Sequence, residues 1–392
     1  MIPYLIVFGA TALTVFATTP LVRKLAVRFG AIDKPSDRKV HPKPTPTLGG
    51  VAIFVGVLVG LVASRLVPDF KTLFGTSSEL WAIVVAGGVI VALGILDDVR
   101  EVVVPAKLAG QILAAGLLVL MGVQLLYFWF PGQGILSLSP DLAVPLTIIW
   151  VLVMVNAVNL IDGLDGLAAG MVAIASIAFF LFIYRTPGIY GGTNPAALIC
   201  AISAGAAVGF LPWNFYPARI FMGDSGAMLL GLLLSVATIS GVGRNAYPPS
   251  GGDLAAVSIP VLVPLLVIAI PLLDVVLAIG RRVRRGSPVS HADKQHIHHR
   301  LLDIGHSHRQ AVLLMYLWSA LISGCALAVA FINGRLTVAV IVVVLLGIFA
   351  ATAIPRLLVV PNGRRKGRHQ AGSGSQNGKD EPATSENARQ PA

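Results

Sequence analysis

Charged residues are scarce in this chain. Asp, Glu, Lys and Arg make up 12% of its 392 residues, whereas hydrophobic residues make up 56% and the mean hydropathy is +0.82. A soluble fold of this length needs a far more polar surface. The shortage of charge therefore excludes a soluble class and predicts a membrane protein.

Cysteine is equally scarce. Cys200 and Cys325 both lie inside apolar stretches, with no Cys-X-X-Cys or Cys/His spacing near either. A disulfide framework and a structural zinc site are therefore not expected. Residues 1–22 lack the basic segment that opens a secretory signal peptide, and their apolar stretch is longer than such a peptide uses. We interpret them as the first membrane helix.

Long apolar stretches, in contrast, recur from the first residues to about residue 360. A membrane-spanning helix needs roughly 20 apolar residues, so the chain is expected to be all-α and polytopic, with about eleven transmembrane helices. Three prolines within one span, Pro260, Pro264 and Pro271, predict a kink in that helix. The expected spans are 3–22, 48–67, 79–96, 105–126, 141–160, 167–185, 195–212, 226–243, 259–280, 311–332 and 337–358.

The basic residues predict the orientation. With eleven spans and the C-terminus inside, 24 of the 29 Lys and Arg residues lie on the cytoplasmic side. Cytoplasmic loops of membrane proteins carry this excess. We therefore expect a multi-pass protein of the cell membrane, with its N-terminus outside and its C-terminus in the cytoplasm.

The net charge of +11 raises the question of nucleic-acid binding. The basic residues lie at span ends, however, and form no separate basic domain with interleaved aromatics, so no nucleic-acid partner is expected. Anionic lipid and phosphate suit this distribution better. Residues 1–358 are interpreted as one transmembrane domain, and the Gly-, Ser- and Asn-rich residues 359–392 as a disordered cytoplasmic tail.

An acidic pair lies where the third expected span reaches the cytoplasm. Adjacent carboxylates repel each other, which favours one protonated and one ionised member, so Asp97 and Asp98 suit a general base or a divalent-cation site. A solvated helix end paired with Arg100 explains them equally well. Lys107 begins the next span, where lysine and a helix N-terminus favour an anion, although a lysine extending to the lipid headgroups is the simpler explanation.

A second loop repeats a polar residue at every third position: Asn156, Asn159, Asp162 and Asp165. The intervening glycines predict that the helix unwinds there, with the four side chains lining one pocket. Amide and carboxylate oxygens suit magnesium, and the same groups recognise a base or a sugar. Turn formation alone explains Asp165 but not two asparagines inside an apolar stretch.

Two further loops lie on the same predicted face. The stretch Phe221-Met-Gly-Asp224-Ser-Gly opens the eighth span, where Asp224 is also suited to cap the helix. A long basic loop carries three histidines and an arginine: His296, His298, His299 and Arg300. Zinc is one interpretation of these histidines, but no well-placed further ligand accompanies them, and the cluster also suits a diphosphate.

The order, spacing and common membrane side of these four loops resemble the polyprenyl-phosphate N-acetylhexosamine-1-phosphate transferase family. The stretch 33–50, with Lys39 and His41, also looks like the first cytoplasmic loop of that family. The resemblance covers nearly all of residues 1–358. It implies transfer of a sugar 1-phosphate from a UDP-sugar to a polyprenyl phosphate with release of UMP. Magnesium, for which manganese can substitute, would be the cofactor, and a homodimer is the implied assembly.

The resemblance also implies roles for individual residues in catalysis. Asp97 and Asp98 would handle the lipid phosphate, one of them as the base, and Lys107 would contact phosphate. Asp162 would belong to the same catalytic set. The third acidic residue of the family's pattern is an aspartate, but here it is Glu101, so its role is left open.

Other residues would bind the metal and the donor. Asp224 would bind magnesium with Asn159 or Asp162, while Asp165 would read the uracil and Phe221 would stack on it. Substrate contacts are also implied for Lys39 and His41 of the first loop. In the basic loop, contacts to the diphosphate or sugar are implied for His296, His298, His299 and Arg300.

The same resemblance bears on the sugar. The stretches 38–41 and 296–299 look like the WecA/TagO branch, which uses UDP-N-acetylglucosamine, and lack the consecutive histidines of the MraY branch. The implied product is polyprenyl-diphospho-N-acetylglucosamine, the first lipid-linked intermediate of a cell-wall or surface polysaccharide. Transfer of phospho-N-acetylmuramoyl-pentapeptide is the alternative within the family.

A polytopic transporter is the alternative from a different class, since broken helices with polar residues are typical of transport. The depth of the polar site in the membrane distinguishes a transporter from an enzyme. A transport site belongs near the middle of the membrane, whereas the expected topology gathers the polar loops at one interface. This favours an enzyme with its active site on the cytoplasmic face.

Overall fold

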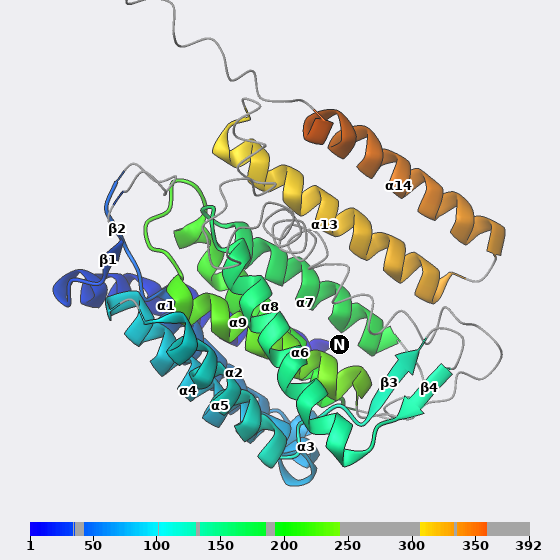
Figure 1. Cartoon of the computed structure of the whole chain (residues 1–392), viewed down its shortest axis with the longest axis horizontal. Coiled ribbons are helices and arrows are strands. Elements are labelled where there is room, and N and C mark those ends of the chain that lie inside the picture. The colour runs from blue at the N-terminus through cyan, green and yellow to red at the C-terminus, as the bar shows by residue number, and fades with distance from the viewer. Residues whose placement is uncertain are drawn as a thin grey trace, which may run out of the picture.

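A computed structural model describes residues 1–33, 35, 43–100, 102–130, 134–185, 193–243, 306–332 and 335–358. Most of these residues form helices, and the long helices lie side by side along a common direction (Figure 1). The helical elements are α1 (Ile2–Arg28), α2 (Gly49–Leu66), η1 (Pro68–Phe70), α3 (Lys71–Thr76), α4 (Glu79–Arg100), α5 (Val104–Leu120), α6 (Pro140–Ile161), α7 (Leu167–Arg185), α8 (Pro195–Asn214), α9 (Gly223–Thr238), η2 (Ile239–Gly243), α13 (His308–Phe331) and α14 (Arg335–Leu358).

The described helices confirm a polytopic membrane protein. Eight of them are long and apolar enough to cross a membrane, and two further apolar stretches, Val104–Leu120 and Ala339–Ala351, are shorter. Each expected span except 259–280 coincides with one of the helices described here. Because 259–280 lies outside the described residues, the count of eleven and the sidedness of the termini stay predictions.

One expected helix end is wrong. The span expected over 105–126 stops at Leu120, where Gly122 takes φ +82°. The N–H groups of Gly122 and Val123 donate to carbonyls of the last helical turn at 2.9 and 2.8 Å. This is the glycine-terminated helix end in which a left-handed residue closes the open carbonyls. The apolar residues after Gly122 therefore cannot continue the helix.

The chain is also not purely helical. Strands β1 (Ile32–Asp33) and β2 (Thr45–Pro46) pair antiparallel, as do β3 (Tyr127–Phe130) and β4 (Gly134–Ser137). The two pairs lie at opposite ends of the helix bundle (Figure 1). Segments of two to four residues carry too little period-two patterning to be separated from apolar helix by sequence.

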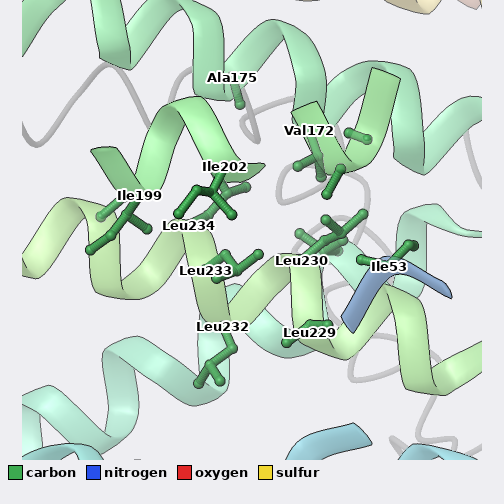
Figure 2. Close-up of a cluster of buried hydrophobic side chains, with 14 of the residues drawn as sticks. Ile53, Val172, Ala175, Ile199, Ile202, Leu229, Leu230, Leu232, Leu233 and Leu234 are labelled. Atoms are coloured by element: carbon green, nitrogen blue, oxygen red, sulfur yellow. The ribbon is translucent and has the colours of Figure 1, made fainter. Parts of the chain in front are cut away.

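Helix α9 forms the centre of the bundle. It packs against α2, α4, α6 and α8, and every residue from 225 to 238 is buried. The leucines of α9 lie among Ile53 of α2, Val172 of α7 and Ile202 of α8 (Figure 2). A helix that is apolar on all sides is expected to occupy such a central place. Its first turn is therefore enclosed by the neighbouring helix ends.

Helix α4 approaches the start of α9 without any side chain between them. Gly94 makes this possible, because a Cβ atom at this position would overlap the backbone of Ser225. The absence of a side chain at glycine permits such close approach of two backbones. The last turn of α4, with its acidic pair, is thereby held beside the first turn of α9.

Candidate functional site

Four helix ends meet beside α9 and bring together residues from separate loops. Asp97 and Asp98 lie in the last turn of α4 and Lys107 in the first turn of α5, while Asn159 ends α6 and Asp224 begins α9. Hydrogen bonds and ion pairs connect these side chains. Because all five lie at helix ends, the cluster belongs at a membrane interface and not midway along the spans.

Lys107 is the centre of this cluster. Its Nζ lies 2.9 Å from Asp97 Oδ2, forms an ion pair with Asp224, and donates to Asn159 Oδ1 at 3.3 Å. Asn159 Nδ2 in turn donates to Asp224 Oδ1 at 2.8 Å. The side chains of Lys107, Asp97 and Asp224 are 18%, 13% and 30% exposed, so a ligand can still reach them. A lysine extending to the headgroups is thus ruled out for Lys107.

Asp98 has a different environment from its neighbour Asp97. Its Oδ1 accepts from the Asp224 N–H at 2.8 Å and from Thr47 Oγ1 at 3.3 Å. Its Oδ2 accepts from the Oγ and N–H of Ser225 at 2.8 and 3.3 Å. Apart from Thr47, these donors belong to the first turn of α9, whose own N-cap residue, Met222, contributes no side-chain bond.

Asp98 therefore caps α9 from another helix. A carboxylate at a helix N-terminus satisfies open N–H groups and interacts favourably with the helix dipole. The expectation that Asp224 itself caps α9 is wrong, because Asp224 lies inside the first turn and its carboxylate faces Lys107. Asp98 in this way also fixes the position of Asp224.

Asp162 directly follows α6, and its N–H donates to the Asn159 carbonyl at 3.3 Å. Burial is the main cause that raises the pKa of Asp162 well above its usual value. The nearby carboxylates of Asp224, Asp98 and Asp165 raise that pKa further. Several carboxyl groups thus lie near one another between α4, α9 and the loop that follows α6.

The donor atoms at this place are of the kind that magnesium requires. Asp224 and Asp162 offer carboxylate oxygens and Asn159 an amide oxygen, all of them hard ligands. Within the described residues, no three His, Cys, Asp or Glu side chains are grouped to hold a metal ion by themselves. Instead, Lys107 lies between the carboxylates of Asp97 and Asp224. The oxygen ligands, and the excess of carboxylates over cationic side chains, fit a divalent cation. Such a cation would share the carboxylates with Lys107.

Asp165 and Phe221, the residues implied in base recognition, lie on segments that contact each other. Asp165 Oδ2 accepts from the Ala218 N–H at 2.9 Å, in the connection between α8 and α9 that also contains Phe221. The backbone of Phe221 bonds to β2 and to the first residue of α2, through Pro46 and Gly49 at 2.9 and 3.0 Å. These hydrogen bonds connect three segments that are far apart in the sequence: the loop after α6, the connection between α8 and α9, and the start of α2.

Several residues singled out in the sequence lie outside the described part of the chain. They belong to the first loop, to the position after α4 and to the long basic loop. Their predicted roles therefore stay predictions for Lys39, His41, Glu101, His296, His298, His299 and Arg300.

Sequence reasoning missed Gln111, which lies one turn beyond Lys107 on α5 and is 1% exposed. Gln111 and Asn156 exchange two amide hydrogen bonds, at 2.7 and 3.3 Å, and Gln111 Nε2 also contacts Met228 Sδ at 3.3 Å. The side chain of Asn156 is thus hydrogen-bonded to Gln111, one helical turn away from the cluster around Lys107. An amide inside an apolar stretch was the signal that could have identified Gln111.

Other contributors carry no comparable signal. Thr47 and Ser225 are ordinary small polar residues, and His308 and Tyr316 approach the loop after α6 from a helix about 150 positions later in the chain. Only the folded structure reveals these contacts.

Comparison with known proteins adds an independent finding. The family model described as Glycosyl transferase family 4 matches residues 80–242, which contain the whole cluster from Asp97 to Asp224. The decaprenyl-phosphate N-acetylglucosaminephosphotransferase of Mycolicibacterium smegmatis is 43% identical over 366 residues, covering 91% of this chain and 89% of the relative. The protein of that name from Mycobacterium tuberculosis is 42% identical over 356 residues, covering 89% and 87%.

A relative with a different name is less similar. The phospho-N-acetylmuramoyl-pentapeptide-transferase of Mycolicibacterium smegmatis is 32% identical over 368 residues, covering 84% of this chain and 97% of the relative. Within one organism, the chain is therefore closer to the N-acetylglucosamine enzyme than to the pentapeptide enzyme.

The cap formed by Asp98 predicts a loss of stability. Asp98→Ala leaves two N–H groups and two hydroxyls of its partners without their acceptor, and is expected to cost about 2–4 kcal/mol. Thermal unfolding of the purified protein in detergent measures this loss. Asp141→Ala, which removes an exposed acid from the first turn of α6, is the matched control and should cost under about 1 kcal/mol. Equal unfolding temperatures for the two variants would contradict the cap.

Proposed function

Because this chain belongs to the polyprenyl-phosphate N-acetylhexosamine-1-phosphate transferases of glycosyl transferase family 4, we propose that it transfers N-acetylglucosamine 1-phosphate from UDP-N-acetylglucosamine to a polyprenyl phosphate. The products are polyprenyl-diphospho-N-acetylglucosamine and UMP. Such a product begins a lipid-linked polysaccharide of the cell wall or cell surface.

The observation that carries this proposal is the cluster around Lys107. An ammonium, two carboxylates and an amide meet at four helix ends, where the expected topology would bring water and lipid within reach. A soluble nucleotide sugar can enter from the aqueous side, and a lipid phosphate can enter along the membrane. Phosphoryl transfer depends mainly on positioning and on neutralisation of phosphate charge, which this cluster is suited to provide.

The proposed reaction is a direct displacement. A phosphate oxygen of the polyprenyl phosphate attacks the phosphorus that carries the sugar, and the bond from that phosphorus to the bridging oxygen breaks. UMP leaves with the bridging oxygen and its electron pair. Asp97, which pairs with Lys107 and does not cap α9, accepts the proton of the lipid phosphate where that phosphate is protonated.

Lys107 supplies a fixed positive charge to the phosphates, and Asp224 and Asp97 hold its Nζ in place. Asp98 acts on the same site by fixing the first turn of α9. Asp224, with Asn159 or Asp162, would hold a magnesium ion, and that ion would supply positive charge to neutralise the diphosphate. Manganese has the same preference for oxygen ligands.

Recognition of the donor involves the neighbouring segments. Asp165 reads the uracil and Phe221 stacks on it, in agreement with the contact between their two segments. The basic loop and the first loop, which lie outside the described residues, would complete the binding of the diphosphate and sugar.

The choice of N-acetylglucosamine rests on two independent observations. The stretches 38–41 and 296–299 resemble the branch that uses this sugar. The relatives named for decaprenyl-phosphate N-acetylglucosamine transfer are 42–43% identical, against 32% for the pentapeptide enzyme of Mycolicibacterium smegmatis. The transporter interpretation finds no support, because the polar cluster lies at helix ends.

The location is also a proposal. The excess of Lys and Arg in the loops assigned to the cytoplasm supports a cell-membrane protein with a cytoplasmic active site. The N-terminus would lie outside and the C-terminus inside, and the family resemblance suggests a homodimer.

Activity with the purified protein tests the function. Wild type with magnesium, decaprenyl phosphate and UDP-N-acetylglucosamine should form a lipid-linked sugar and release an equal amount of UMP. Asp224→Ala and Asp97→Asn should lower kcat by about 10³-fold, because the first removes a proposed metal ligand and the second the proposed base, while Asp141→Asn should not. Chelation of magnesium should stop the reaction. Absence of any lipid-linked product from wild type refutes the proposal.

UDP-N-acetylmuramoyl-pentapeptide, offered in a parallel assay, distinguishes the two branches of the family. The proposal expects a kcat/KM for this donor at least about 100-fold below that for UDP-N-acetylglucosamine, as an extended peptide has no matching contacts. A preference for the pentapeptide donor would move the chain to the other branch.

The orientation is tested by placing single cysteines next to each terminus in a variant that lacks Cys200 and Cys325. A membrane-impermeant thiol reagent added to intact cells should label the N-terminal cysteine and leave the C-terminal one unlabelled until the cells are opened. Labelling of both termini in intact cells would mean an even number of spans.

A further inference from the structure

The loop after α6 is held by α13 from far along the chain. The Asp165 N–H donates to Nε2 of His308, in the first turn of α13, at 3.0 Å. Because Nε2 accepts this bond, His308 is neutral and carries its proton on Nδ1. The position of the Asp165 backbone is therefore set by a side chain of α13.

Both backbone polar groups of Gly166, the next residue, are hydrogen-bonded. Its N–H donates to Asn214 Oδ1 at 3.1 Å, and its carbonyl accepts from the Tyr316 hydroxyl. Gly166 has φ +82°, and a Cβ atom there would lie 3.1 Å from the Phe215 ring. Only glycine fits such a position, so the loop takes one defined path.

The first turn of α13 also holds the connection between α8 and α9. The Tyr216 ring stacks on the His308 ring, with centroids 4.6 Å apart and planes 21° apart. Arg309 Nε donates to the Tyr216 carbonyl at 3.2 Å, and its guanidinium lies 5.9 Å from the Tyr216 ring centroid. This connection continues to Phe221, so α13 contacts both segments assigned to base recognition.

The carboxylate of Asp165 is left oriented for a ligand. Oδ2 accepts from the Ala218 N–H, while Oδ1 has no hydrogen-bond partner among the residues that the structure describes. Uracil presents an N–H at ring position 3, which a carboxylate oxygen can accept. Cytosine presents a lone pair at the same position, which a carboxylate repels. The rigid placement of Asp165 therefore affects both affinity and base choice.

We propose that His308 and Tyr316 are positioning residues that set the affinity for the uridine nucleotide, by holding Asp165 and Gly166 against the segment that carries Phe221. This inference rests on the proposed function. Neither residue contacts Asp97, Lys107 or Asp224, so their effect is expected on donor binding and not on the chemical step.

Steady-state kinetics of the full-length protein test this. His308→Leu should raise KM for UDP-N-acetylglucosamine about tenfold, with kcat and the KM for decaprenyl phosphate within about twofold of wild type, since one hydrogen bond to a binding residue is lost. Tyr316→Phe, which loses only its hydroxyl, should raise the donor KM in the same way. Inhibition by UMP should weaken relative to inhibition by CMP in both variants.

Two further variants separate positioning from a general effect on folding. His308→Gln keeps an acceptor at a similar reach and should recover most of the donor affinity. Tyr184→Phe, at the other end of α7, where the hydroxyl accepts a hydrogen bond from the N-terminal amine, should behave as wild type. Unfolding temperatures are measured for all four variants.

An unchanged donor KM in His308→Leu and Tyr316→Phe overturns the inference while the transferase function stands. Equal losses of kcat and of both substrate affinities in His308→Leu and His308→Gln also overturn it, because they indicate a structural role alone. An inactive wild type would instead refute the proposed function, and this inference with it.

Discussion

The structure depends on the pairing of charge at the ends of apolar helices. Lys107 brings one positive charge to a place where Asp97 and Asp224 bring two negative ones, and Asn159 links the lysine to Asp224. Unpaired charges at such positions are costly, so the pairing fixes how the ends of α4, α5, α6 and α9 approach one another. The excess negative charge that remains suits the divalent cation of the proposed function.

Adjacent residues acquire different roles through helix geometry. Successive side chains on a helix point about 100° apart, so the carboxylates of Asp97 and Asp98 point in different directions. Asp97 faces Lys107, and Asp98 caps α9. One carboxylate is thus available to a substrate while the other maintains the geometry. In the proposed function, the acidic pair would therefore serve both the reaction and the packing of α9.

Much of the fold was predictable, because membrane spans carry long and continuous signals. The helices and the grouping of Asp97, Lys107, Asn159 and Asp224 near one face followed from apolar length and from polar residues that interrupt it. The early end of α5 was readable in principle from Gly122. Short strands and the α13 contacts were not, since His308 and Asp165 are 143 positions apart and nothing local marks them as partners.

The central claim is that Lys107 and Asp224 depend on each other for stability. Thermal unfolding of Lys107→Met, Asp224→Asn and the double variant tests it most directly. Lys107→Met alone leaves two carboxylates facing each other and should be the least stable, whereas the double variant should unfold at a higher temperature, with a coupling of about 1–3 kcal/mol. A double variant whose loss equals the sum of the two single losses would contradict the account.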